Sequence, residues 1–245
     1  MNRWLIVPCF NEAKRLDQTR ILSYTSTLQC NVLLVNDAST DATQNLIDEI
    51  VRLSNGTVHS LVQVRNSGKA EAVRAGLLLA IKYGASIVGY TDADGAVSEF
   101  DLMRLFDELD LDGTNNAVIG SRVALLGHQI TRRPVRHVTG RVFATLASLT
   151  LHHIIYDTQC GAKIFRVTPN FLTSLSDRVI SRWGFDVELL GRLIKLAGTH
   201  SAHGIREVPL ASWDDLEGSK LKTIHGIKTY WELFAIRKSL SKWTA

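Results

Sequence analysis

The sequence predicts an α/β fold in which a mostly parallel sheet is flanked by helices within a single domain, residues 1–245. Short apolar runs rich in branched residues alternate with helical segments through the first half of the chain. This alternation is typical of parallel sheets with helices on both faces. The chain is long enough for one sizeable core and short for two full domains. Its 45% apolar and 21% charged residues are ordinary for a soluble globular protein.

The predicted elements follow in order along the chain. Five strands are expected in the first half, at residues 3–8, 31–37, 58–64, 86–92 and 116–122. The helices between them are expected at 17–29, 39–53, 68–84 and 98–109. The helix at 39–53 opens with Ser, Thr and Asp, which are good N-caps, and the helix at 98–109 opens with a sequence close to a capping box.

The second half is expected to elaborate the same domain. It should contain a basic helical region at 132–155, a strand at 162–167, a helix near 185–197, a strand at 205–210, a polar loop at 214–220 and an amphipathic terminal helix at 226–243. The terminal helix is apolar on one side and basic further on, so docking onto the core and lying at a membrane interface are both open for it.

Composition excludes several classes of protein. The longest apolar runs are too short to span a bilayer, and the N-terminus does not have the form of a signal peptide. Three widely spaced cysteines predict reduced thiols in a cytoplasmic protein, with neither a disulfide framework nor a zinc site. Arginines are present, but no RNA- or DNA-binding module is recognisable, so we expect no nucleic-acid partner.

Positive charge is concentrated in two segments. Residues 122–141 hold five arginines and no acidic residue, and residues 217–245 hold six Lys or Arg against two acidic residues. A basic strip on a mildly acidic body suggests an anionic partner: nucleic acid, a membrane surface or a phosphorylated substrate. The alternative is that these arginines only make a helix face soluble.

Acidic residues directly follow three of the predicted strands. Glu12 follows the first strand, Asp37 the second, and Asp92 with Asp94 the fourth. Ligands bind such sheets at the carboxyl ends of the strands, so this convergence predicts a site at one edge. The segment around Lys69 lacks the glycine spacing of a phosphate loop or a dinucleotide fingerprint, which argues against nucleotide hydrolysis and NAD chemistry.

Asp92 and Asp94 stand one residue apart among small residues. When a glycosidic bond to a sugar nucleotide breaks, the charge of the diphosphate must be neutralised, and Mg²⁺ or Mn²⁺ held by one or two carboxylates does this. A capping cluster before the helix at 98–109 would have a similar sequence, so the pair alone leaves both interpretations open. The other strand-end acids favour a site.

Seven blocks of the chain resemble a known family. VPCFNEAKRL, VNDASTDAT, YTDADGA and IGSR together resemble family 2 inverting glycosyltransferases of the GT-A fold. DTQCGAKIF, RWGFDVELL and EGSKL resemble its polyprenyl-phosphate branch, and within it the dolichyl-phosphate β-glucosyltransferases. The resemblance covers nearly the whole chain in order.

The resemblance implies roles at the nucleotide end for residues in matching positions: Pro8, Asn11, Glu12, Asp37 and Asp92. The first three would surround the nucleoside, and Asp37 would hold the base or ribose. Asp94 would bind Mg²⁺ or Mn²⁺ and would thereby be catalytic. The related mannosyl branch usually has Gln where this chain has Ala96, which favours a glucosyl donor, UDP-glucose.

The acceptor side is expected to bind a lipid phosphate through arginines, whose planar fork matches phosphate oxygens. The arginines available for this are Arg122, Arg132, Arg133, Arg136 and Arg141. A phosphomonoester, with a second pKa of about 6, is itself the nucleophile, so no separate base is required. Arg122 and Lys220 are predicted to be catalytic, and Ser219 should bind substrate with Lys220 in a closing loop.

The remaining blocks of the second half contain both functional candidates and residues expected to be structural. Asp186 is predicted to bind substrate and Glu188 is a functional candidate, whereas Trp183 and Phe185 are expected in the core. His152 and His153 are expected to be packing or surface residues, and Cys160 an unreactive thiol.

The sequence thus predicts a metal-dependent transferase that moves a hexose onto a polyprenyl phosphate. Residues 1–122 would bind the nucleotide sugar and residues 123–245 the acceptor, at the cytoplasmic face of an anionic membrane to which the protein attaches peripherally. A glycan or soluble phosphate acceptor is the alternative within enzymes. A catalytically silent sugar-nucleotide-binding protein is the alternative outside them.

Overall fold

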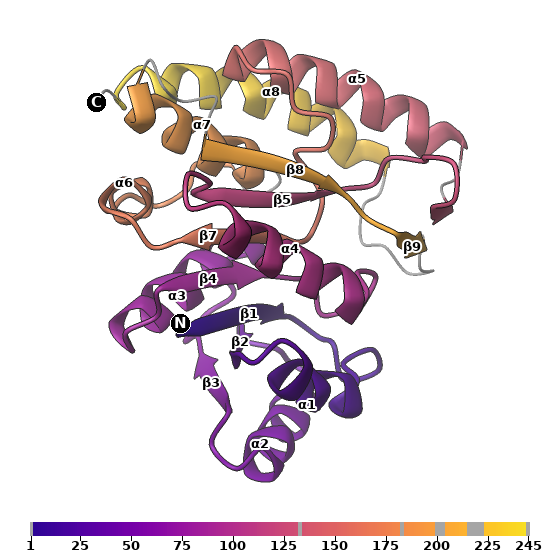
Figure 1. Cartoon of the computed structure of the whole chain (residues 1–245), viewed down its shortest axis with the longest axis vertical. Helices are drawn as coiled ribbons and strands as arrows, with labels where there is room; N and C mark the ends of the chain where they lie inside the picture. The colour runs from indigo at the N-terminus through magenta and orange to yellow at the C-terminus, as the bar shows by residue number, and fades with distance from the viewer. Residues whose placement is uncertain (1, 132–133, 182–183, 199–203, 215–222, 244–245) are drawn as a thin grey trace.

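The computed structural model describes residues 2–131, 134–181, 184–198, 204–214 and 223–243, and the side chains of all these except 134–137 and 223–230. In this part of the chain seven strands form one sheet in the order β3-β2-β1-β4-β7-β5-β8 (Figure 1). The strands are β1 Arg3–Cys9, β2 Asn31–Asn36, β3 Val58–Val62, β4 Ile87–Tyr90, β5 Ala117–Ser121, β7 Lys163–Arg166 and β8 Ile205–Pro209. All pairings are parallel except those of β7, which runs antiparallel to both β4 and β5. The predicted mostly parallel sheet is therefore confirmed.

Helices cover both faces of the sheet (Figure 1). One face packs against α1 Gln18–Thr27, α2 Thr43–Leu53 and α4 Glu99–Leu111. The other face packs against α3 Lys69–Lys82, α6 Pro169–Ser174 and α7 Phe185–Ala197. Beside α7, at the β5–β8 end of the sheet, lie α5 Pro134–Leu151 and α8 Thr223–Leu240.

The middle strands are buried on both faces. Their sequences are therefore nearly continuous apolar runs instead of alternating apolar and polar residues. Helix α3 approaches them closely at Gly76. A β-carbon at this position would lie 2.6 Å from Cγ2 of Ile6 and 2.9 Å from Cγ2 of Val35. Only a residue without a side chain lets α3 pack this near β1 and β2, so this mid-helix glycine serves packing.

The helix predicted at 39–53 begins four residues later than expected, at Thr43, because Ser39 bonds to another loop and Asp41 is shared between that loop and the start of the helix. The hydroxyl of Ser39 accepts the backbone N–H of Asn11 at 3.0 Å. The carboxylate of Asp41 accepts those of Ala13 and Thr43 at 3.3 and 3.0 Å. These side chains tie the loop after β1 to the loop after β2 and so fix two walls of the strand-end region.

Three short elements were not predicted. They are α6 and the two strands of a second, parallel sheet, β6 Gln129–Thr131 and β9 Ser212–Asp214. Strand β9 also bridges to the loop before α4, where Val97 pairs with Trp213. The predicted polar loop at 214–220 lies outside the described residues except for Asp214. None of the described helices is both long enough and apolar enough to cross a membrane.

Candidate active site

The structure brings the predicted acidic residues to one edge of the sheet. Strand β1 lies between β2 and β4, and all three run parallel, so the loops that follow them leave the sheet side by side. The backbone N–H of Asp37, just after β2, donates to the carbonyl of Cys9 at the end of β1 at 2.9 Å. Glu12, Asp37, Asp92 and Asp94 therefore lie on neighbouring loops of one site.

The Asp92–Asp94 turn is bordered by basic side chains. The ammonium group of Lys69, the first residue of α3, forms an ion pair with the carboxylate of Asp92. Both side chains are about one third exposed, at 37% and 36%, so the pair lies at an open surface. The guanidinium of Arg20 donates to the backbone carbonyl of Asp94 at 3.4 Å. One positive partner of the two acids is thus a lysine that follows the third strand.

The two acids do not cap the helix that follows them. Ser98 is the N-cap of α4, and its hydroxyl accepts the backbone N–H of Asp101 at 3.1 Å. Asp94 instead accepts the N–H of Ala96 at 3.1 Å within the turn. The alternative that this pair caps α4 is therefore wrong, because Ser98 caps the helix.

The donor set of the turn fits one hard divalent cation. Burial, followed by the nearby negative charge of Asp92, raises the pKa of the Asp94 carboxyl above its ordinary value. A dication between or beside these groups would relieve that repulsion. Among the described residues no cluster of three or more His, Cys, Asp or Glu side chains forms a cage. Mg²⁺ and Mn²⁺ commonly need only one or two carboxylates, with substrate phosphates and water as the other ligands.

Asp37 is buried and shapes the start of α3. Its two carboxylate oxygens accept the backbone N–H groups of Ser67 and Gly68, each at 2.7 Å. Gly68 has a φ of +89° and directly precedes Lys69. The Asp37 carboxylate therefore fixes the loop that places Lys69 beside Asp92.

The residues predicted around the nucleoside lie near the end of β1 and on the loop after it. Glu12 is buried and holds the guanidinium of Arg15 in a two-point ion pair, at 2.7 and 2.6 Å. The side chain of Asn11 accepts the N–H of Thr40 at 2.8 Å. Pro8 lies half-buried near the end of β1. The hydrogen bond to Glu12, and after it the charges of Glu12, Asp94 and Asp92, raise the pKa of Arg15 and together outweigh the lowering by burial.

Arg122, predicted to be catalytic, is held by Asp157 in a two-point ion pair. Its Nε and Nη2 atoms donate to the two carboxylate oxygens at 2.7 and 2.8 Å. The guanidinium lies 5.2 Å from the ring centre of Trp213 on β9. Burial lowers the pKa of Arg122, but the charge of Asp157, the hydrogen bonds to it and the charges of other nearby groups together more than offset this, so the pKa is raised. Arg122 is therefore a fixed cation, already paired, at the end of β5.

Asp186 lies in a buried polar cluster with Lys163 and Tyr90. Its Oδ1 accepts the ammonium of Lys163 at 2.5 Å and the hydroxyl of Tyr90. Lys163 is fully buried and also donates to the carbonyl of Cys160 at 2.6 Å. This pairing gives Asp186 a structural position at the N-terminus of α7, and its substrate role stays a prediction.

The remaining predicted residues divide into three groups. Glu188 is buried and paired with Arg192 at 2.6 Å, which is a structural role. Phe185 is in the core as expected, and the three cysteines are free and buried, with burial raising the pKa of Cys160 to about 11. Arg132, Arg133, Trp183, Ser219 and Lys220, and the side chain of Arg136, lie outside the described residues.

Sequence reasoning missed Lys69 and Gly161 as members of the site. Lys69 follows the third parallel strand, so the rule that located the acids at strand ends could have located it too. Gly161 precedes β7, and a β-carbon there would overlap Oδ2 of Asp92 and lie 2.8 Å from its Cγ. No local signal marks this contact, because it depends on the antiparallel insertion of β7 beside β4.

Comparison with known proteins agrees with this geometry. The family described as Glycosyl transferase family 2 matches residues 4–171. A dolichyl-phosphate beta-glucosyltransferase of Trichomonas vaginalis is 31% identical, covering 94% of this chain and 69% of its own. The dolichyl-phosphate beta-glucosyltransferase of Saccharomyces cerevisiae is 30% identical, covering 95% of this chain and 73% of its own.

Among solved structures, glucosyl-3-phosphoglycerate synthase from Mycobacterium tuberculosis has the same fold. Its complex with Mn²⁺, UDP and phosphoglyceric acid superimposes with a TM-score of 0.67, at 16% identity, over 98% of this chain and 78% of that one. The GT-A-like fold expected from the sequence is thereby confirmed. The chain, with its strand-end acids and its match over more than half its length, belongs to glycosyl transferase family 2 and is a glycosyltransferase.

Proposed function

We propose that this enzyme transfers glucose from UDP-glucose to a polyprenyl phosphate, with Mg²⁺ or Mn²⁺ as cofactor. The observation that carries the proposal is the Asp92–Asp94 turn at the end of β4, beside Lys69 and the loops after β1 and β2. The names of the relatives that match nearly the whole chain support the donor sugar and the lipid acceptor.

The donor end of the site would bind the nucleotide sugar. In this proposal four residues lie around the nucleoside: Pro8 near the end of β1, and Asn11, Glu12 and Asp37 on the loops after β1 and β2. The side chains of Ser39 and Asp41 tie these two loops together. Residues 1–122 would thus form the donor half of the enzyme, and residues 123–245 the acceptor half.

The diphosphate would bind at the turn. Asp94 would hold the divalent ion, which neutralises charge on the departing diphosphate when it is bound. Lys69 would add a second positive charge at the same place, because it already lies against Asp92. The Mn²⁺ in complexes of glucosyl-3-phosphoglycerate synthase supports a divalent ion in this fold.

The acceptor would supply its own nucleophile. A phosphate oxygen would attack the anomeric carbon of glucose from the face opposite the leaving group, while the bond from that carbon to UDP breaks and UDP takes the electron pair. The product is the β-linked glucosyl phosphate, and no proton needs to move. The arginines of the acceptor half would position the acceptor phosphate. Arg122 would orient it together with Arg132, Arg133 and Arg136, so that catalysis depends on positioning and charge.

Three further residues would contact the donor. Ser219 and Lys220 would close over the diphosphate, and Asp186 would contact the sugar.

Two neighbouring proposals complete the assignment. With a lipid acceptor, the reaction would occur at a membrane surface. We propose that this is the cytoplasmic face of the membrane. A soluble phosphate acceptor is the second candidate, since the fold is shared with an enzyme crystallised with phosphoglyceric acid.

A panel of donors and acceptors tests these proposals. UDP-glucose, UDP-galactose, UDP-GlcNAc and GDP-mannose would each be incubated with a short polyprenyl phosphate or with phosphoglyceric acid, with Mg²⁺ or Mn²⁺, and products identified by mass. The expected result is a glucosylated polyprenyl phosphate from UDP-glucose alone. Transfer only to phosphoglyceric acid would favour the second candidate. Donor binding without transfer to either acceptor would contradict both.

A further inference from the structure

The outer face of α5 carries a stripe of exposed apolar side chains. Its members are Val138, Val142, Leu146 and Leu149. Spacings of four, four and three residues place them on one side of the helix. The opposite side, which includes Phe143 and Ala147, packs into the core with α7 and α8. The stripe is therefore additional to what the fold of α5 requires.

Helix α8 has the same division. Leu233, Ile236 and Leu240 pack into the same core cluster. Trp231 and Phe234 point outward, 71% and 70% exposed, with ring centres 6.0 Å apart. The alternative that this helix docks onto the core is thus confirmed for one of its faces only. Two large aromatic rings remain on the other face.

Helices α5 and α8 are neighbours. Helices α5 and α8 pack against each other at the upper end of the molecule in Figure 1, and their inner sides share one core cluster. We call their combined exposed side the α5–α8 surface, comprising Val138, Val142, Leu146, Leu149, Ile154, Trp231, Phe234, Arg237, Lys238 and Lys242. Large exposed apolar side chains gathered on two helices that pack together indicate an interaction site.

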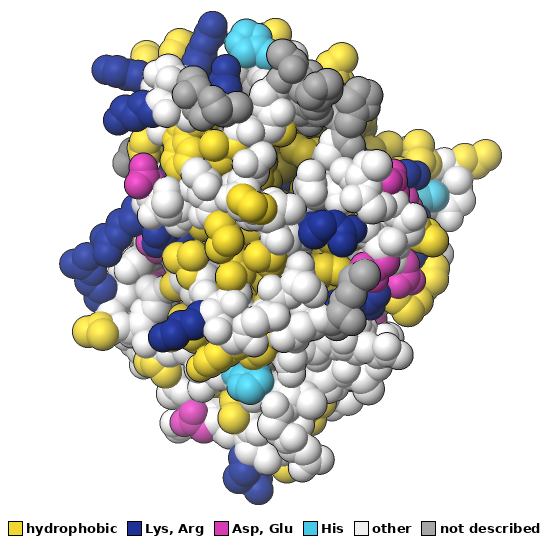
Figure 2. Space-filling model, turned by 60° about the vertical axis from the view of Figure 1, so that its left-hand side comes forward, with side chains coloured by type: hydrophobic (Ala, Val, Ile, Leu, Met, Phe, Trp, Pro, Cys, Tyr) yellow, Lys and Arg dark blue, Asp and Glu magenta, His cyan; other side chains and the backbone are white. Residues whose placement is uncertain are grey.

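The charge on this surface is of one sign. Residues 138–156 contain no Asp or Glu. Arg237 and Lys238 on α8, and Lys242 just after its end, are exposed. Figure 2 shows Lys and Arg side chains gathered at this upper end of the molecule beside hydrophobic ones. Glu232, the one acidic residue in the described side chains of α8, accepts the N–H of Gly184 at 3.3 Å on the inner side.

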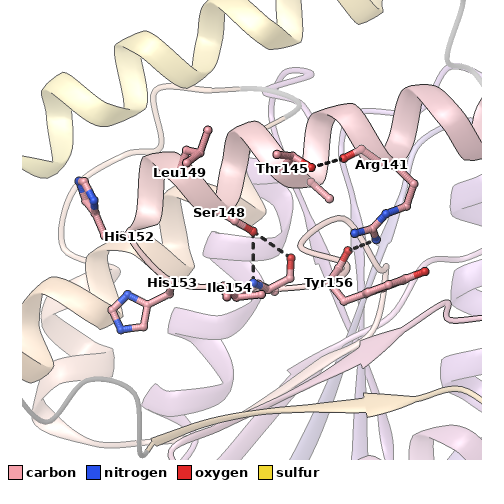
Figure 3. Close-up of a pocket in the computed structure, with 10 residues that line it drawn as sticks. Arg141, Thr145, Ser148, Leu149, His152, His153, Ile154 and Tyr156 are labelled. Carbon is pink, nitrogen blue, oxygen red and sulfur yellow. Dashed lines mark hydrogen bonds between the residues drawn. The ribbon is translucent and has the colours of Figure 1, made fainter.

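A hollow of about 420 Å³ opens at the C-terminal end of α5 (Figure 3). Leu149, His152 and Ile154 line it, and Ile154 is 99% exposed. Arg141, also on its wall, lies 3.7 Å from the ring centre of Tyr156 and donates to the carbonyl of that residue at 2.9 Å. A fixed guanidinium beside apolar side chains suits the headgroup phosphate and the first chain carbons of a bilayer lipid.

We propose that the α5–α8 surface lies on an anionic lipid bilayer, with its apolar side chains among the headgroups and its cations at the lipid phosphates. Tryptophan and phenylalanine flanked by Lys and Arg are the composition of segments that lie in this interface. A second copy of the chain fits less well, because its cations would meet cations. This inference rests on the proposed function in that the acceptor is a membrane lipid.

Vesicle sedimentation of the full chain tests the surface. Vesicles of phosphatidylcholine with and without phosphatidylserine would be mixed with wild type, W231S/F234S, L149S/I154S and R237S/K238S/K242S. Val64→Ser with Leu111→Ser is the matched control, since both residues are exposed and apolar but lie elsewhere. Wild type and control should bind the anionic vesicles. The three surface variants should bind them about tenfold more weakly or worse.

Transfer to a short, water-soluble polyprenyl phosphate separates this proposal from the proposed function. The surface variants should retain wild-type transfer to that acceptor while losing vesicle binding. Wild-type binding by all three variants, or failure of the wild type to bind anionic vesicles, overturns the inference. Gel filtration that shows a wild-type dimer and monomeric variants would overturn it in favour of a second copy. Absent transfer by a vesicle-bound wild type would contradict the proposed function and leave the surface standing.

Discussion

Gly161 lies against the carboxylate of Asp92, so closely that a β-carbon at position 161 would overlap Oδ2 and lie 2.8 Å from Cγ. Gly161→Ala should therefore displace Asp92 from Lys69 and lower kcat/KM for the nucleotide sugar about tenfold or more, which is about 1.4 kcal/mol. Gly113→Ala is the control, because nothing lies within 4 Å of its β-carbon position. Steady-state kinetics on both variants checks this, and unchanged kinetics in a folded G161A would contradict it.

Asp94→Asn should abolish metal-dependent donor binding and reduce transfer about a hundredfold or more, because the ion loses its charged ligand. Titration calorimetry of UDP-glucose with and without Mn²⁺ measures the first effect. Near-normal turnover in the variant, or full wild-type activity in excess chelator, would show that no metal acts here.

The same substitution should stabilise the metal-free protein. Burial and the charge of Asp92 raise the pKa of Asp94 in the folded state, so ionisation at neutral pH costs stability. Asn removes that cost, and the melting temperature of D94N at pH 7 should exceed that of wild type. Well below a pH of about 4, where the carboxyl is protonated in both folded and unfolded states, the difference should vanish. A lower melting temperature for D94N at pH 7 would contradict the pKa direction.

Asp37→Ala should weaken UDP binding by about 1.5–3 kcal/mol, since a charged hydrogen-bond acceptor is lost. The loss would include the release of the Ser67 and Gly68 N–H groups that precede Lys69. Ser67→Ala keeps the backbone N–H and should bind UDP as wild type does. Calorimetry at matched metal concentration measures both, and unchanged affinity in a folded D37A would remove Asp37 from the site.

Variants of the Arg122–Asp157 ion pair distinguish a structural role of Arg122 from a catalytic one. Asp157→Ala leaves a largely buried guanidinium unpaired and should lower the free energy of unfolding by about 3 kcal/mol. R122M/D157L removes both charges and should recover much of that stability while transfer stays lost. Urea unfolding and single-turnover transfer measure the two properties, and a stable, active double variant would show that Arg122 is structural only.

Replacing Arg132, Arg133 and Arg136 with alanine should spare donor binding and raise the KM for polyprenyl phosphate about tenfold or stop transfer, because each arginine can hold phosphate oxygens. Arg52→Ala, an exposed arginine on α2, is the control. Normal transfer to the lipid phosphate by the triple variant would remove these residues from the acceptor site.

The order of strands and helices through the first half, and the edge at which the acids gather, follow from local rules that can be read along the chain. Apolar periodicity identifies each element, and parallel strands separated by helices must all end at one edge. For this reason Glu12, Asp37, Asp92 and Asp94 can be grouped from their sequence positions alone. The start of α2 is the exception, because Ser39 bonds to the loop after β1 and the carboxylate of Asp41 is shared between that loop and the N–H of Thr43, the first residue of the helix.

What surrounds those acids depends on tertiary contacts. Strand β7 lies antiparallel between β4 and β5. This brings Gly161 against the carboxylate of Asp92 and lets Lys163 form an ion pair with Asp186. Asp157 reaches Arg122 across 35 residues of chain, and the outward face of α8 depends on where α5 and α7 pack. These contacts join residues far apart in sequence, and their free energy depends on packing and burial that exist only once the sheet has formed. These contacts cannot be predicted from a local sequence pattern. The same run of residues is compatible with more than one partner strand, or with burial of either face of a helix.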